Sequence, residues 1–112
     1  MGTPRQPRSD KTNARFAHRK VVERDVECAL VDNVRAAGGE AYKFVSPGRI
    51  GVPDRIVILP GKRPVFVELK SETGRLSAAQ LRECQRLEAL GQRVRIVSSI
   101  KEALSFAEKL TP

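Results

Sequence analysis

The chain has 112 residues, of which 40% are hydrophobic and 30% charged, and it carries a formal net charge of +8. This length holds one domain with one hydrophobic core, and this composition is that of a water-soluble globular protein, which excludes a second catalytic domain and a largely disordered chain. The longest apolar run, around residues 55–60, is far too short for a membrane span, and the chain does not begin with a hydrophobic secretion signal, so we expect a cytoplasmic protein.

Positive charge is concentrated at the start of the chain. Residues 1–22 contain six Lys or Arg against Asp10 alone, a net +5 that leaves +3 for the remainder. A pI near 10.2 favours polyanionic partners, because each phosphate that a cation neutralises releases counterions, and nucleic acid is the first expected partner. Residues 1–17 are interpreted as a flexible basic tail, which either binds phosphate or only aids solubility, and residues 18–112 as the folded domain.

The first half of the domain is predicted to hold one helix and three strands. Apolar side chains recur at helical spacing and predict a helix over residues 18–37, which a Gly-Gly pair ends. Residues 41–45 are β-prone and end at a Ser-Pro-Gly turn. The apolar runs 55–59 and 65–70 flank a short segment rich in Pro and Gly, so we expect them to form a hairpin.

The second half predicts a helix, a strand and a helix. Ser77 with Gln80 is a capping-box pattern that begins a helix running to Leu90, and residues 93–98 are expected to form a strand. A second Ser-x-x-Glu cap at Ser99 begins the last helix. The order is α-β-β-β-α-β-α, and the continuous apolar runs predict a sheet covered by helices on both faces, an α/β sandwich.

The two cysteines are assigned no function. Cys28 and Cys84 both fall in predicted helices, and no CxxC pair is present. His18 is the single histidine, so a zinc site would lack ligands. Two thiols in a cytosolic chain are expected to be reduced residues that pack within the helices.

Charged side chains near the end of the run 65–70 carry the chemical prediction. Glu68 and Lys70 are two residues apart, so they share one face of a strand that is otherwise apolar. Buried charges are costly unless they are paired or bound to a metal. A hairpin centred on Lys62 sets Asp54 opposite Lys70 and Ile56 opposite Glu68 on that face. Two carboxylates and one ammonium group are therefore expected to converge.

This group has a plain and a chemical interpretation. An isolated ExK pattern is most often a salt-bridged strand end. The chemical interpretation gains from the place of Asp54, which comes directly after the rigid turn Gly51-Val52-Pro53 and at the first position of the neighbouring strand. Turn and spacing together favour a catalytic group.

Three segments together resemble a known family, the VRR-NUC branch of the PD-(D/E)xK nucleases. They are SPGRIGVPDR at 46–55, FVELK at 66–70 and LSAAQ at 76–80. The resemblance extends over about residues 21–108 and implies a restriction-endonuclease-like fold with a mixed central sheet flanked by helices. It also implies that Asp54, Glu68 and the main-chain carbonyl of Leu69 hold Mg²⁺ or Mn²⁺. Lys70 is then expected to orient the attacking water and to offset charge on the phosphate.

Two further residues are assigned to the site. Gln80 only completes the Ser77 cap in one interpretation, whereas in the other, which the resemblance implies, it also reaches the catalytic group and positions water or Lys70. In the first helix, periodicity favours Glu23 as the acid that faces the site. The similarity of this helix to that of archaeal junction resolvases favours Glu27 instead. We adopt Glu27 as catalytic residue and metal ligand and keep Glu23 as the alternative.

DNA contacts are predicted in the loop that leads to Asp54. Ser46, Gly48 and Arg49 lie in a Pro-Gly turn suited to gripping a phosphate, and Arg55 follows it; the alternative is a simple strand connector. Aromatic residues make up only 4% of the chain and Trp is absent, which disfavours binding by base stacking on single strands. Duplex or branched DNA is the expected partner.

These inferences lead to a divalent-metal-dependent DNA endonuclease. Resemblance to stand-alone members of phage or bacterial type implies a homodimer that cuts branched DNA such as four-way junctions, like a Holliday junction resolvase, inside a bacterial or phage-infected cell. Two alternatives stay open. One is a non-cutting nucleic-acid-binding module on the same fold, and the other is an accessory protein in which Asp54, Glu68 and Lys70 form a structural ion-pair network. Chelator-sensitive cleavage separates all three.

Overall fold

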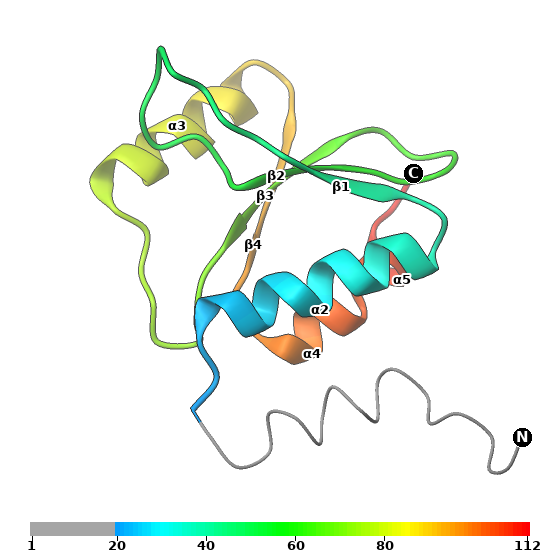
Figure 1. Cartoon of the computed structure of the whole chain (residues 1–112). Helices are drawn as coiled ribbons and strands as arrows, with labels where there is room; N and C mark the ends of the chain where they lie inside the picture. Colours follow the sequence, from blue (N-terminus) through cyan, green and yellow to red (C-terminus); the bar gives the residue numbers. More distant parts are fainter. Residues whose placement is uncertain (1–19) are drawn as a thin grey trace, which may run out of the picture.

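The computed structural model describes residues 20–112 (Figure 1). The predicted basic tail and the first two residues of the predicted first helix lie outside the described residues. Helices and strands follow one another in the described part as α2 (Glu23–Ala36), β1 (Glu40–Lys43), β2 (Arg55–Ile58), β3 (Val65–Leu69), α3 (Ala78–Ala89), β4 (Arg93–Val97), α4 (Ile100–Leu104) and α5 (Phe106–Lys109). The predicted order of elements is confirmed, with the last helix divided in two.

The strands of this part of the chain form one mixed sheet in the order β1-β2-β3-β4. β1 pairs with β2 and β2 with β3 in antiparallel fashion, while β4 lies parallel to β3. The connection from β3 to β4 runs through α3, because two parallel neighbours need a crossover between them. The predicted α/β class with a mixed central sheet is confirmed.

The β2–β3 hairpin is centred on Gly61 rather than on Lys62. Arg55 pairs with Val67, two residues before the partner that the sequence predicted. Gly61 has a φ of +70°, a left-handed conformation that glycine adopts without a steric penalty, and it therefore occupies the centre of the turn.

This register corrects the expected partner of Asp54. Continued by one residue, the observed pairing sets Asp54 opposite Glu68, so the expected alignment with Lys70 was wrong. The observed register differs from the predicted one by two residues, and side chains alternate between the faces of a sheet with a period of two. The three charged residues therefore remain on the predicted common face.

One face of the sheet forms the hydrophobic core against α2, α4 and α5, which lie together on that side in Figure 1. Its side chains are apolar and almost fully buried: Val26, Ala29, Leu30, Val34, Val57, Val65, Val67, Leu69, Val97 and Ala103. Alternate residues of β2 and β3 point into this layer. Each fully buried Val or Leu contributes about 1.5 to 3 kcal/mol, so this layer supplies most of the stabilising burial.

The opposite face is covered by α3 only in part. α3 packs against β4, whereas Tyr42 of β1 and Ile58 of β2 remain 58% and 38% exposed. The expectation of two covered faces therefore holds beside β4 and fails over β1 and β2. The start of α3 is held by a hydrogen bond from Gln80 to Glu68, which keeps the helix at one end of the sheet.

The helix ends follow local signals. α2 begins at Glu23, where the Asp25 carboxylate accepts a hydrogen bond from the Val22 amide at 2.9 Å, and it ends before Gly38, whose φ is +87°. The predicted last helix is interrupted at Ser105, whose hydroxyl donates to the carbonyl of Lys101 at 3.1 Å. Within residues 20–112, no helix has the length and apolar character that crossing a bilayer requires.

Asn33 joins the helical layer together. Its Nδ2 donates to the carbonyl of Leu104 at 2.7 Å, and its Oδ1 accepts from the amide of Ala107 at 2.9 Å. Replacing Asn33 by Ala should lower the free energy of unfolding by about 2 kcal/mol, since two hydrogen bonds are lost and both backbone groups lose their partner. Urea denaturation measures this. Arg35→Ala, which removes only an exposed ion pair to Glu40, is the control, and an equal loss there would contradict the role of Asn33.

Candidate catalytic site

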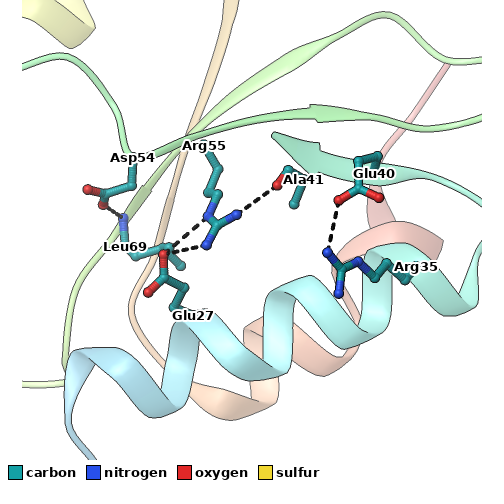
Figure 2. A network of polar contacts seen from close by, with 7 residues as sticks. All are labelled: Glu27, Arg35, Glu40, Ala41, Asp54, Arg55 and Leu69. Atoms are coloured by element: carbon teal, nitrogen blue, oxygen red, sulfur yellow. Dashed lines mark hydrogen bonds and ion pairs between the residues drawn. The ribbon is translucent and has the colours of Figure 1, made fainter. Parts of the chain in front are cut away.

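Asp54 is held at the edge between β2 and β3. It follows the buried Pro53, and its carbonyl accepts a hydrogen bond from the Phe44 amide at 2.9 Å, which continues the β1–β2 pairing. Its side-chain Oδ2 accepts from the amide of Leu69 at 2.8 Å (Figure 2). The carboxylate is therefore fixed across the end of β3, next to Glu68.

Glu68 is a buried acid with one unsatisfied oxygen. Its Oε2 accepts a hydrogen bond from Nε2 of Gln80 at 2.8 Å and lies 3.6 Å from Nζ of Lys70. Its Oε1 is buried and has no hydrogen-bond partner within residues 20–112. Burial, together with the negative charge of Asp54, raises the pKa of Glu68 to about 7, although Lys70 acts in the opposite direction. A cation at Oε1 would offset this cost.

Lys70 lies beside Glu68 directly after β3. Its amide donates to the carbonyl of Val97 at 3.0 Å, which continues the parallel pairing, and its side chain is 14% exposed. Glu68 and Lys70 thus come together as their spacing predicted, and both act electrostatically with Asp54 in the same small region.

Gln80 completes the Ser77 cap and also contacts Glu68. Its amide donates to Oγ of Ser77 at 3.1 Å and its Oε1 accepts from the Ser77 amide at 2.8 Å, which completes the capping box. Its Nε2 remains available and donates to Glu68. The cap therefore fixes the side chain that holds the buried acid in place.

The two acids of α2 have different surroundings. The pKa of Glu23 is raised, most strongly by burial and next by the negative charge of Asp54, while the positive charge of Lys70 acts in the opposite direction. Glu23 therefore lies within electrostatic reach of Asp54 and Lys70. Glu27, one turn later, forms an ion pair with Arg55 at 2.9 Å instead.

Arg55 is engaged inside the molecule (Figure 2). Its Nε and Nη2 donate to the same carboxylate oxygen of Glu27 at 3.1 and 2.9 Å, and its Nη1 donates to the carbonyl of Ala41 at 2.8 Å. This pair joins β2 and β1 to α2. The contacts occupy the guanidinium group that the sequence assigned to DNA and the carboxylate that it assigned to a metal.

The remaining predicted DNA contacts lie in the loop before Asp54. The carbonyl of Ser46 accepts from the Arg49 amide at 3.3 Å, which closes a turn around the exposed Gly48. The side chain of Arg49 reaches α3 and lies 3.4 Å from a carboxylate oxygen of Glu83. No sequence motif points to Glu83, which lies three residues after Gln80 and so near the same side of the helix.

The donor set at the site fits a hard divalent cation. Within residues 20–112, no three His, Cys, Asp or Glu side chains form a metal cluster. Two carboxylates, a main-chain carbonyl and water are nevertheless sufficient oxygen ligands for Mg²⁺ or Mn²⁺, which retain several waters. The unpartnered Oε1 and the raised pKa of Glu68 both fit such a site.

Comparisons with known proteins show the family of the chain. The family model of the VRR-NUC domain matches residues 8–100. A protein of Acyrthosiphon pisum secondary endosymbiont phage 1, named "Putative nuclease p44", is 51% identical over 81 residues, which are 72% of this chain and 87% of the phage protein. A solved VRR-NUC domain structure is similar with a TM-score of 0.71 and 34% identity, covering 80% of this chain and 97% of that one. These matches support a nuclease activity, and the chain belongs to the VRR-NUC domain family.

Proposed function

We propose that this chain is a divalent-metal-dependent endonuclease that hydrolyses phosphodiester bonds of DNA, on the PD-(D/E)xK plan. The observation that carries the proposal is Glu68, a buried carboxylate with one oxygen unpartnered within residues 20–112, beside Asp54 and Lys70. A buried carboxylate oxygen without a hydrogen-bond partner is costly in a purely structural ion pair. A cation bound at that oxygen would offset this cost.

Asp54, Glu68 and the carbonyl of Leu69 would hold Mg²⁺ or Mn²⁺. When bound, such an ion supplies an activated water and neutralises charge that develops on the phosphate. Gln80 holds Glu68 through its hydrogen bond to Oε2, which leaves Oε1 available to such an ion. Lys70 places its ammonium beside the two acids, where it can orient the attacking water and stabilise the charged phosphate oxygens.

For the carboxylate of α2 we propose Glu23 rather than Glu27. Glu23 shares its electrostatic environment with Asp54 and Lys70, whereas the carboxylate of Glu27 is occupied by Arg55. Glu27 is then a positioning residue that acts through Arg55 on β2, the strand that directly follows Asp54.

Branched DNA is the proposed substrate, and a homodimer the proposed assembly, in a bacterial or phage-infected cell. The phage relative and the basic net charge support a DNA partner. A small domain with one site spans little DNA, so two copies related by a two-fold axis would place a site on each of two opposed strands of a four-way junction.

The direct test incubates the purified protein with labelled linear, flap and four-way DNA in the presence of Mg²⁺ or Mn²⁺. We expect nicking that EDTA abolishes and that is lost in Glu68→Ala, with the highest rate on the four-way substrate. Binding without any nicking would establish a non-cutting module instead. If the protein neither binds nor nicks DNA, Asp54, Glu68 and Lys70 form only a structural ion-pair network.

Lys70→Ala is expected to lower the cleavage rate by about 10³-fold, because the ammonium group stabilises the negative charge that develops on the phosphate during the reaction. The carboxylates remain, so calorimetric titration with Mn²⁺ should still detect binding. Lys43→Ala, at the exposed end of β1, is the control for loss of a positive charge. Turnover at the wild-type rate in Lys70→Ala would remove the lysine from the mechanism.

A further inference from the structure

A hollow of about 320 Å³ lies between the loop before Asp54 and α3. We call it the arginine groove and define it by the residues that line it: Arg49, Ile50, Ala79, Arg82, Glu83 and Arg86. Three of these are arginines and one is an acid. Arg82 and Arg86 were not singled out by the sequence, since charged residues on a helix are usually a solvated face.

The two walls of the arginine groove are fixed against each other. Gly51 has a φ of +80°, and a Cβ atom there would lie 2.5 Å from the carbonyl oxygen of Ala79, so the loop rests directly on the first turn of α3. Arg49 reaches across to the buried Glu83 at 3.4 Å. The two walls are therefore held together by backbone contact and by the ion pair of Arg49 with a buried acid.

Charge in the groove is unbalanced. Arg82 and Arg86 are exposed and one helical turn apart, a spacing at which like charges repel. In the part of the chain that the structure describes, neither arginine forms an ion pair, because the nearby acid, Glu83, is paired with Arg49. Three cations and one anion leave a net charge of +2, which a bound anion would offset.

The groove adjoins the catalytic group. Ala79 lines it, and the next residue, Gln80, donates to the buried Glu68. An anion held here would therefore be a close neighbour of the phosphate at the catalytic site. Guanidinium groups bind phosphate oxygens in a planar, two-pronged geometry, and the groove offers no aromatic platform for a base.

We propose that the arginine groove binds a backbone phosphate of DNA other than the one that is cleaved. This inference rests on the proposed nuclease function and adds to it the surface that holds the substrate next to the site. Arg82 and Arg86 make the contact from α3, and Arg49 makes it from the loop, where Glu83 sets its position.

The test measures DNA binding by fluorescence anisotropy in the Glu68→Ala background, with a labelled duplex and a labelled four-way junction. Arg82→Ala/Arg86→Ala should weaken binding by about tenfold near 0.1 M salt, and the slope of log affinity against log salt should become shallower by about 1, because one phosphate is no longer neutralised. In the catalytically active protein, the same two substitutions should raise the KM for DNA cleavage by about the same factor as they weaken binding.

The control removes two positive charges far from the groove. Arg63→Ala/Lys109→Ala changes exposed side chains at the β2–β3 turn and on α5, and it should leave affinity and salt slope unchanged. Equal losses in both double variants would overturn the groove, because net charge alone would then explain binding. Unchanged binding in Arg82→Ala/Arg86→Ala would overturn it while wild-type cleavage still supports the proposed function. A wild-type protein that neither binds nor cuts DNA would overturn both.

Discussion

Glu68→Gln is expected to abolish cleavage and to stabilise the metal-free protein at the same time. The amide keeps the shape of the side chain and can still accept the hydrogen bond from Gln80, but it cannot act as an anionic ligand. Loss of that ligand should lower the cleavage rate by about 10³-fold or more. A purely structural acid would show neither a catalytic loss nor a gain in stability.

The gain in stability depends on pH in a defined direction. The pKa of Glu68 rises from 4.5 to about 7 on folding, so between these values the folded state holds a proton that the unfolded state releases. Wild-type stability therefore falls as the pH rises through this window, and the full cost, about 3 kcal/mol, is present well above pH 7. Glu68→Gln carries no such cost.

Urea denaturation in EDTA at pH 4 and pH 8 checks this prediction. Glu68→Gln should match the wild type at pH 4, where Glu68 is protonated in both states, and exceed it at pH 8. Glu72→Gln, at an exposed position after β3, should show no such difference between the two pH values. A variant less stable than the wild type at pH 8 would mean that the carboxylate is satisfied in the folded protein.

A second large effect is expected from a matched pair of substitutions on α2. Glu23→Gln should lower the single-turnover cleavage rate by about 10²-fold without a loss of stability, because this exposed acid shares the electrostatic environment of Asp54 and Lys70 and forms no ion pair within residues 20–112. Glu27→Gln should lower the free energy of unfolding by about 1 kcal/mol, because it weakens the ion pair to Arg55, and should reduce cleavage far less.

Single-turnover rates and urea denaturation, measured on both variants, distinguish the two acids. The two residues are one turn apart on the same helix and undergo the same chemical change, so each is the control for the other. A larger catalytic loss in Glu27→Gln than in Glu23→Gln would restore Glu27 as the acid of the site.

The common face of Glu68 and Lys70 on β3 could be predicted from the sequence because its signals are local. The two-residue spacing of Glu68 and Lys70 fixes a common face whatever the register, and the Pro53 turn fixes where Asp54 stands. The partner of Asp54 could not be predicted in the same way. It depends on the backbone conformation of Gly61, and both Gly61 and Lys62 are compatible with the centre of such a turn.

The choice between Glu23 and Glu27 depends on a contact distant in sequence. Helical periodicity separates the two acids only slightly, while Arg55 on β2 engages one of them directly. The same holds for the arginine groove, since Arg82 and Arg86 acquire meaning only when Gly51 brings the loop onto α3. Pairings of this kind are set by tertiary packing, which a linear pattern does not encode.

The position of the turn at Gly61 sets which side chains lie opposite each other at the other end of the hairpin. Asp54 and Glu68 are equally distant from it along the two arms of the hairpin, so the lengths of the arms decide which side chains meet. One residue inserted in either strand would turn the carboxylate of that strand toward the core. Two inserted residues would keep it on the same face but shift it out of alignment with the other carboxylate. At the tip, by contrast, the space around Gly61 is open. A fluorescent label or an epitope inserted there would extend the loop and leave the alignment of both acids intact.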